Sequence, residues 1–136
     1  MGVCLGLMFD TEVPNTGAFE ECIADGKDFV YEMDWLDSVC DRLDILPFSR
    51  FCPDDDELEA AYEATPKGKK FEGIWFEPAD GLKTVNRLMK ALNLEIKDTT
   101  GQRKKKLEFW IATLAALETD LKKARRKMAR FAFFYY

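Results

Sequence analysis

The chain has 136 residues and a net charge of −5, and none of its residues is histidine. This length fits one domain, which we expect to cover residues 1–136, and the 47% apolar share fits a packed core rather than a disordered chain. The absence of histidine removes the commonest general base and the commonest zinc ligand from the chemistry available to the protein.

The first third of the chain is predicted to contain one strand and two helices. Residues 3–9 alternate with apolar side chains on both faces, which is typical of a strand covered on both sides. Turn-forming residues predict a loop at 10–17, followed by a short helix at 18–25. A second helix is predicted at 29–43, and residues 45–51 are expected to be extended.

The middle of the chain is predicted to alternate helices with one short strand. Acidic residues 54–57 favour a helix start, where the backbone dipole is positive, and this helix is expected to extend to about residue 64. A loop is expected at 65–70 and an aromatic strand at 71–76. A further helix is predicted at 77–93.

The strongest periodic pattern lies at residues 106–130, where apolar side chains recur at alternating spacings of three and four. This pattern predicts one long helix with a single apolar seam. The seam consists of Leu107, Trp110, Leu114, Leu117, Leu121, Ala124, Met128 and Phe131. The aromatic run at residues 131–136 favours a final strand, with a frayed helix end as the alternative.

These elements predict an α+β fold, with a small mixed or antiparallel sheet packed on a long C-terminal helix. An all-α bundle is the alternative if the two terminal runs do not pair. We expect residues 131–136 to lie against the N-terminal strand. We also expect the chain's own acidic helices to cover the second half of the long helix and to neutralise Lys122, Arg125 and Arg126. Such cover favours a monomer over a homodimer.

The charges are unevenly distributed along the chain. Residues 103–136 hold ten Lys and Arg against three acids, whereas residues 1–102 hold ten against twenty-two. The basic side chains at 103–106 and 122–130 are of the type that meets phosphate, but the chain as a whole is acidic, so we do not expect nucleic acid as the partner.

The four cysteines form no Cys-x-x-Cys pair, and no leader sequence or membrane-spanning run is evident. We therefore expect a cytoplasmic protein with four thiols and no contact with a membrane. Ser49 and Cys52 are the candidate nucleophiles, but neither has an identifiable base, so no catalytic residue is assigned.

Two groups of aspartates are the candidate binding residues. Four of them fall on one stripe of the second predicted helix, and two open the next helix. A stripe of this kind either binds a divalent cation or faces solvent, and we expect solvent, because helical di-metal sites add a Glu-x-x-His element. We therefore predict no metal and no cofactor. The candidate residues are Asp34, Asp37, Asp41, Asp44, Asp55 and Asp56.

By elimination, we expect a small acidic protein-interaction module rather than an enzyme. Small inhibitors and immunity proteins, which the chain resembles only in size and charge, act in this way on a partner protein with a basic surface. An enzyme or small-ligand binder with a carboxylate-lined pocket is one alternative. A homodimeric scaffold joined through a helix is another.

Overall fold

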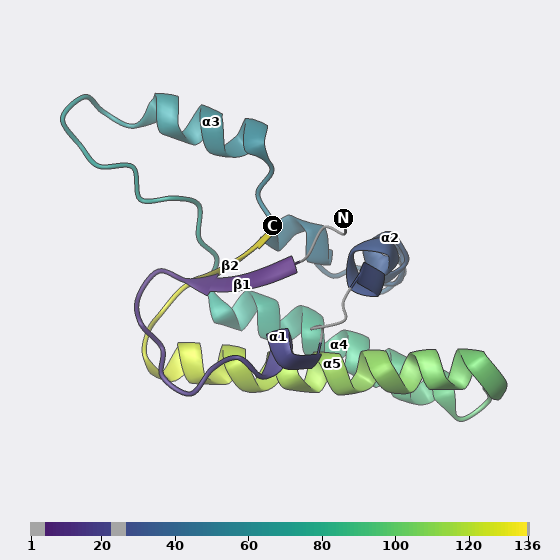
Figure 1. Cartoon of the computed structure of the whole chain (residues 1–136). Coiled ribbons are helices and arrows are strands. Elements are labelled where there is room, and N and C mark those ends of the chain that lie inside the picture. Colours follow the sequence, from purple (N-terminus) through teal and green to yellow (C-terminus); the bar gives the residue numbers. More distant parts are fainter. Residues whose placement is uncertain (1–4, 23–26, 136) are drawn as a thin grey trace.

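The computed structural model describes residues 5–22 and 27–135, with a strand at each end of the chain and helices between them (Figure 1). The predicted α+β fold is confirmed. The elements are β1 (Leu5–Phe9), α1 (Ala18–Cys22), α2 (Lys27–Arg42), the 3-10 helix η1 (Phe48–Phe51), α3 (Asp55–Ala64), α4 (Pro78–Ile96), α5 (Gly101–Arg126) and β2 (Phe131–Tyr135).

The two strands pair with each other although they lie at opposite ends of the sequence. They are antiparallel, with Leu5 opposite Tyr135 and Phe9 opposite Phe131. The Asp10 amide extends the ladder by donating to the Arg130 carbonyl at 3.0 Å. The prediction that the C-terminal run lies against the N-terminal strand is thus confirmed for the described residues, which exclude 1–4 and 136.

The sheet lies on a pair of helices, α4 and α5, which run side by side beneath it (Figure 1). Gly81 on α4 permits this close approach. A Cβ at that position would lie 2.6 Å from Phe131 Cζ on β2 and 3.0 Å from Leu121 Cδ1 on α5. Any larger residue there would push the sheet and the helix pair apart.

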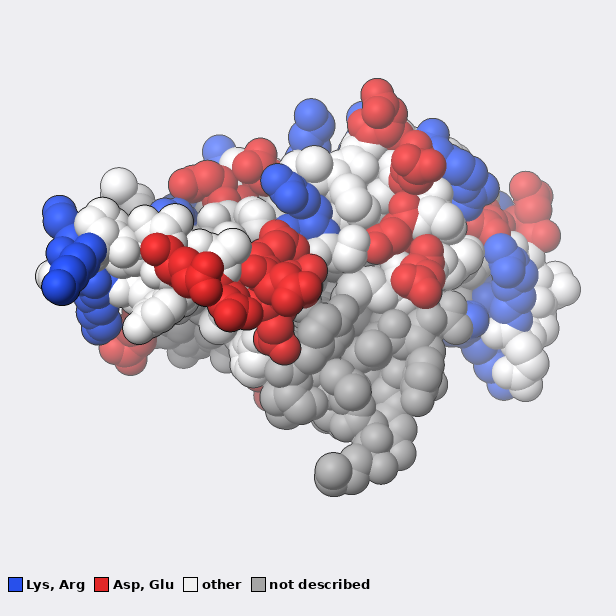
Figure 2. Space-filling view, turned by 90° about the horizontal axis from the view of Figure 1, so that it is seen from above, with Lys and Arg blue, Asp and Glu red and all other residues white. Residues whose placement is uncertain are grey.

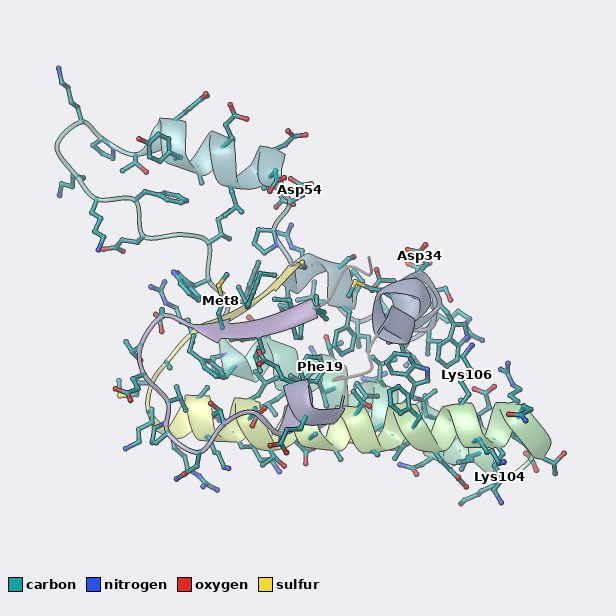
Figure 3. All side chains as sticks on the ribbon, viewed as in Figure 1. Met8, Phe19, Asp34, Asp54, Lys104 and Lys106 are labelled. Atoms are coloured by element: carbon teal, nitrogen blue, oxygen red, sulfur yellow. The ribbon has the colours of Figure 1, made fainter. Side chains whose placement is uncertain are left out.

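The apolar seam of α5 forms the centre of the core. The side chains of Leu107, Trp110, Leu114, Leu117 and Leu121 are each at most 1% exposed. They belong to one buried cluster with apolar residues of α2, α4 and both strands. Phe19 of α1 lies between β1 and α5 in this cluster (Figure 3).

The long helix ends earlier than the seam predicts. Met128 adopts a left-handed backbone with φ 56°, and its side chain is 90% exposed. The Ala129 amide donates to the Ala124 carbonyl and the Met128 amide to the Arg125 carbonyl, which is the bonding of a Schellman motif. Assigning Met128 to the seam was therefore wrong, because this motif ends the helix at Arg126 and turns the chain back into β2.

Two segments that were predicted to be extended do not form strands in the described part of the chain. Residues 71–76 contribute only a single bridge between Phe76 and Phe131, because Gly73 bends the segment with φ 88° before it can follow β2. Within residues 45–51, Phe48–Phe51 forms the 3-10 helix η1, which buries both phenylalanines.

Other boundaries differ by a few residues. The helix predicted at 77–93 continues to Ile96, since Asn93 Nδ2 donates back to the Met89 carbonyl at 2.9 Å instead of ending the helix. α2 begins at Lys27, and α5 begins at Gly101. The second half of the helix predicted at 18–25 falls in 23–26, outside the described residues.

The second half of α5 is covered by the chain itself, but not by the elements expected. The loop after β1 and the start of α1 lie on it: Val13 packs with Ala124, and Lys123 Nζ donates to the Asn15 carbonyl. Helix α3 stands on the other side of the sheet, and α2 lies beside the end of β1, where its Trp35 lines a hollow with Lys106 and Leu107 of the first half of α5 (Figure 1). Among the side chains that the structure describes, no ion pair joins an acid of these helices to Arg125 or Arg126, so the expected neutralisation by those helices was wrong.

Leu114 offers a direct test of the core. Truncation to Ala should lower the free energy of unfolding by about 2–5 kcal/mol, because the side chain is fully buried at the centre of the seam. Chemical denaturation measures this loss. Met128→Ala is the matched control and should change stability by less than about 0.5 kcal/mol. A loss that small for Leu114→Ala would contradict the assigned core.

Candidate functional site: an acidic face

The six predicted aspartates lie on α2, just after it, and on α3. Asp34 and Asp41 on α2, Asp44 after its last residue, and Asp55 and Asp56 on α3 are exposed. In the described part of the chain none of these five carboxylates forms an ion pair. Figure 2 shows acidic side chains gathered over α2 and α3 on one face of the molecule. Figure 3 shows Asp34 and Asp54 on the opposite side of the sheet from Lys104 of α5.

Asp37 differs from its neighbours on the stripe. It is half-buried, and its Oδ1 accepts the backbone N–H of Ser49 at 3.2 Å. This bond joins α2 to η1, so Asp37 has a structural role that its spacing in the sequence does not reveal. Its carboxylate is less available to a partner than those of Asp34 and Asp41.

Asp44 has both an exposed carboxylate and a defined backbone role. Its φ is 54°, and the Ile45 amide donates to the Cys40 carbonyl while the Asp44 amide donates to the Asp41 carbonyl. This is a second Schellman motif, which ends α2. Aspartate adopts the left-handed conformation more readily than most residues, so the local structure accounts for an aspartate at this position.

Asp54 begins α3 and fixes where the acidic pair Asp55 and Asp56 lies. Its Oδ1 accepts the Glu57 amide at 2.7 Å, and Glu57 Oε1 accepts the Asp54 amide at 3.5 Å. This reciprocal capping box agrees with the expectation that residues 54–57 start a helix.

The candidate nucleophiles have no catalytic arrangement around them. Ser49 is exposed, and its described link to a carboxylate is through its backbone amide. Cys40 and Cys52 are buried thiols, whereas the side chains of Cys4 and Cys22 lie outside the described residues. Burial, followed by the nearby Asp37 charge, raises the pKa of Cys40 to about 12, so its thiol stays protonated near neutral pH.

A hollow of about 300 Å³ lies between β1 and the loop that leads to α1, and carboxylates line it. Two of them hold the fold together. Glu20 Oε1 accepts the Leu7 amide at 2.9 Å, on the edge of β1 away from β2. Asp120 is occupied by other backbone amides. A carboxylate-lined pocket was the alternative predicted from sequence, but these groups are engaged in backbone hydrogen bonds.

Asp120 is the buried carboxylate that sequence analysis missed. It is fully buried on α5, and its Oδ2 accepts the Phe19 amide at 3.0 Å, while the Gly17 amide approaches both oxygens. It thus supplies acceptors for amides at the N-terminus of α1, which that short helix cannot satisfy itself. One signal was present: Asp120 lies three residues after Leu117 and four before Ala124, on the apolar side of the helix.

Asp10 and Arg130 form a second contact that the sequence did not reveal. Asp10 Oδ1 accepts the Arg130 amide at 2.7 Å, and Oδ2 accepts Arg130 Nε at 2.8 Å. Partial burial raises the pKa of Asp10, but the hydrogen bonds and the positive charge of Arg130 outweigh it, so the net pKa lies below the ordinary 3.8. The pair fixes the end of the sheet where β1 leaves and β2 enters.

The basic residues of α5 do not form one surface. The positions around Lys104 and those around Arg126 lie at opposite ends of the helix, on the order of 30 Å apart. Several have partners already: Arg103 pairs with Glu95, Lys122 pairs with Glu118 at 3.3 Å, and Lys123 Nζ donates to the Asn15 carbonyl.

Among residues 5–21 and 33–134, whose side chains the structure describes, no three Cys, Asp or Glu side chains converge as ligands for a metal ion. Over the same ranges, none of the helices combines the length and the apolar character needed to cross a membrane. Comparisons with protein-family models, with curated proteins and with solved structures gave no match.

Asp120→Ala should lower the free energy of unfolding by about 1.5–3 kcal/mol, because it leaves two amides of the α1 start without their charged acceptor. Chemical denaturation measures the loss, and amide hydrogen exchange at Phe19 should speed up in parallel. Glu118→Ala removes only a surface pair and should cost less than about 1 kcal/mol. Equal losses in the two variants would mean that the buried carboxylate contributes no more to stability than an ordinary surface ion pair.

Asp10→Asn should destabilise the protein in a pH-dependent way. A carboxylate whose pKa is lowered by folding stabilises the fold above its unfolded pKa, and this contribution disappears as pH falls through the lower folded value. The difference in unfolding free energy between wild type and variant should therefore be largest above about pH 5 and shrink below pH 3.8. A difference that is constant down to the acid limit would contradict this assignment.

Proposed function

We propose that the protein is an acidic interaction module that binds a partner protein through a basic surface on that partner. The observation that carries the proposal is the acidic face, on which Asp34, Asp41 and Asp44 are exposed and form no ion pair within the described residues. Asp55 and Asp56 extend this face onto α3. A field of one sign attracts an oppositely charged surface and speeds its association.

The proposed mode of action is that of a small inhibitor or immunity-type protein, in the cytoplasm. Exposed carboxylates would steer and orient the basic partner, and the buried apolar residues of α2 would hold the aspartates of that helix in place. Helix α5 takes no part in this contact or in pairing with a second copy, because its seam is buried within its own chain. Burial of the seam thus argues against the homodimer joined through that helix.

The test uses three aspartates whose replacement should leave the fold intact. In the variant Asp34→Asn, Asp41→Asn, Asp44→Asn, each change is isosteric, and asparagine tolerates the left-handed backbone at position 44. Asp37 is left unchanged because of its bond to Ser49. The partner is first captured from native cells with the wild-type protein and identified by mass spectrometry.

We expect the association rate of the captured partner to fall by about tenfold or more in the triple variant and to fall with rising salt. The matched control is Asp98→Asn with Glu108→Gln, which removes two exposed charges outside the acidic face and should leave the rate nearly unchanged. A partner that binds the triple variant as fast as the wild type would show that the face is simply solvated.

A further inference from the structure

Residues 53–75 form an arm, which we define as α3 together with the chain that returns from it toward Phe76. None of the α3 residues is buried, and Figure 1 shows the helix standing clear of the sheet and of the other helices. In the described structure, the hydrogen bonds of residues 54–75 join partners inside that segment. The arm is therefore attached to the body mainly at its two ends.

The arm presents an apolar face with little to cover it. Tyr62 is 65% exposed, and its ring meets the Phe71 ring edge-on, with centroids 5.7 Å apart. Leu58 and Ala61, on the same side of α3, are half-buried. A ten-residue helix is marginal in water by itself, so this face would gain stability from a further surface.

Charge changes sign along the arm. Acidic residues 54–57 and Glu59 lie toward the body, whereas at the far tip Glu63 in the last turn of α3 is followed by the lysines Lys67 and Lys69. Figure 2 shows basic side chains at that extremity and acidic ones over α3. The two lysines also line a hollow of about 310 Å³ beside Tyr62 and Phe71. Glu63 lines the same hollow, so the tip carries two lysines against one acid and is basic on balance, with two aromatic rings beside it.

We propose that the arm pairs with the arm of a second copy of this chain, in antiparallel orientation about a two-fold axis. This arrangement places the acidic base of each arm against the basic tip of the other and brings the two Tyr62 side chains together at the centre. A parallel arrangement would oppose like charges. A surface that is complementary to itself is what a two-fold interface requires.

This pairing shares Asp55 and Asp56 with the proposed partner-binding face, but it uses neither the aspartates of α2 nor the buried seam of α5. The expectation of a monomer concerned pairing through α5, whereas the arm is a separate surface. In the paired state Asp55 and Asp56 lie near the second copy, and the aspartates of α2 remain available to a basic partner. The triple variant described above lies wholly outside the arm, so the two proposals fail independently.

The test is the oligomeric state of the whole protein and of two charge-reversed variants, measured by light scattering and sedimentation at several concentrations. Wild type should approach twice 15.7 kDa as concentration rises. Lys67→Glu with Lys69→Glu makes the arm acidic throughout, and Asp56→Lys with Glu59→Lys removes acids from its base. Each variant alone should dimerise about tenfold or more weakly, and an equimolar mixture should recover the wild-type affinity.

Tyr62→Ala provides a second, charge-independent test and should also weaken the dimer by about tenfold. Leu94→Ala, which truncates an exposed side chain of α4 outside the arm, should leave it unchanged. Circular dichroism shows that each variant is folded. A wild type that stays monomeric at every concentration overturns the proposal. A dimer that withstands both the charge reversals and Tyr62→Ala, or a mixture that fails to re-form it, also overturns it.

Discussion

The fold depends on the burial of one face of α5. A long helix is not stable with such an apolar seam exposed to water, so other elements must cover the seam. The elements that cover it include segments from both ends of the sequence. Helix α4 lies along it, β2 returns over it after the Schellman motif at Met128, and α1 is held to it by Asp120. Pairing of β1 with β2 then joins the two chain ends above this platform.

Elements with a long, regular pattern could be predicted from the sequence, because one local feature fixes them. The seam of α5 and the acid-rich start of α3 are of this kind. The segment 71–76 was predicted wrongly since aromatic propensity does not supply a neighbouring strand: Gly73 turns the chain away, and only Phe76 meets β2. Met128 was misassigned because its spacing fits the helix, whereas the helix end is set by backbone hydrogen bonds.

For the candidate site, exposure of the aspartates followed from their spacing, but their structural roles did not. Asp37 bonds to η1, and Asp10 bonds to Arg130, 120 positions away. Such contacts depend on how distant segments meet, and no local period encodes them. Asp120 differs, because a carboxylate on the apolar stripe of a helix can be recognised in the sequence. Such a group is buried only where hydrogen bonds compensate for its lost hydration, so its position predicts hydrogen-bond donors from another segment.

The separation of the charges follows from the same architecture. Some of the 22 acids of residues 1–102 pair with basic residues of 103–136, as Glu95 does with Arg103 and Asp10 with Arg130. Helix α3 instead stands beyond the sheet on the side away from α5 (Figure 1), and Asp34 and Asp41 lie on the exposed face of α2. The acids of α2 and α3 are therefore left facing water. The residues that stabilise the fold are thus largely different from those that give the acidic face its charge. Substitutions can therefore change the charge of that face while the buried core is preserved.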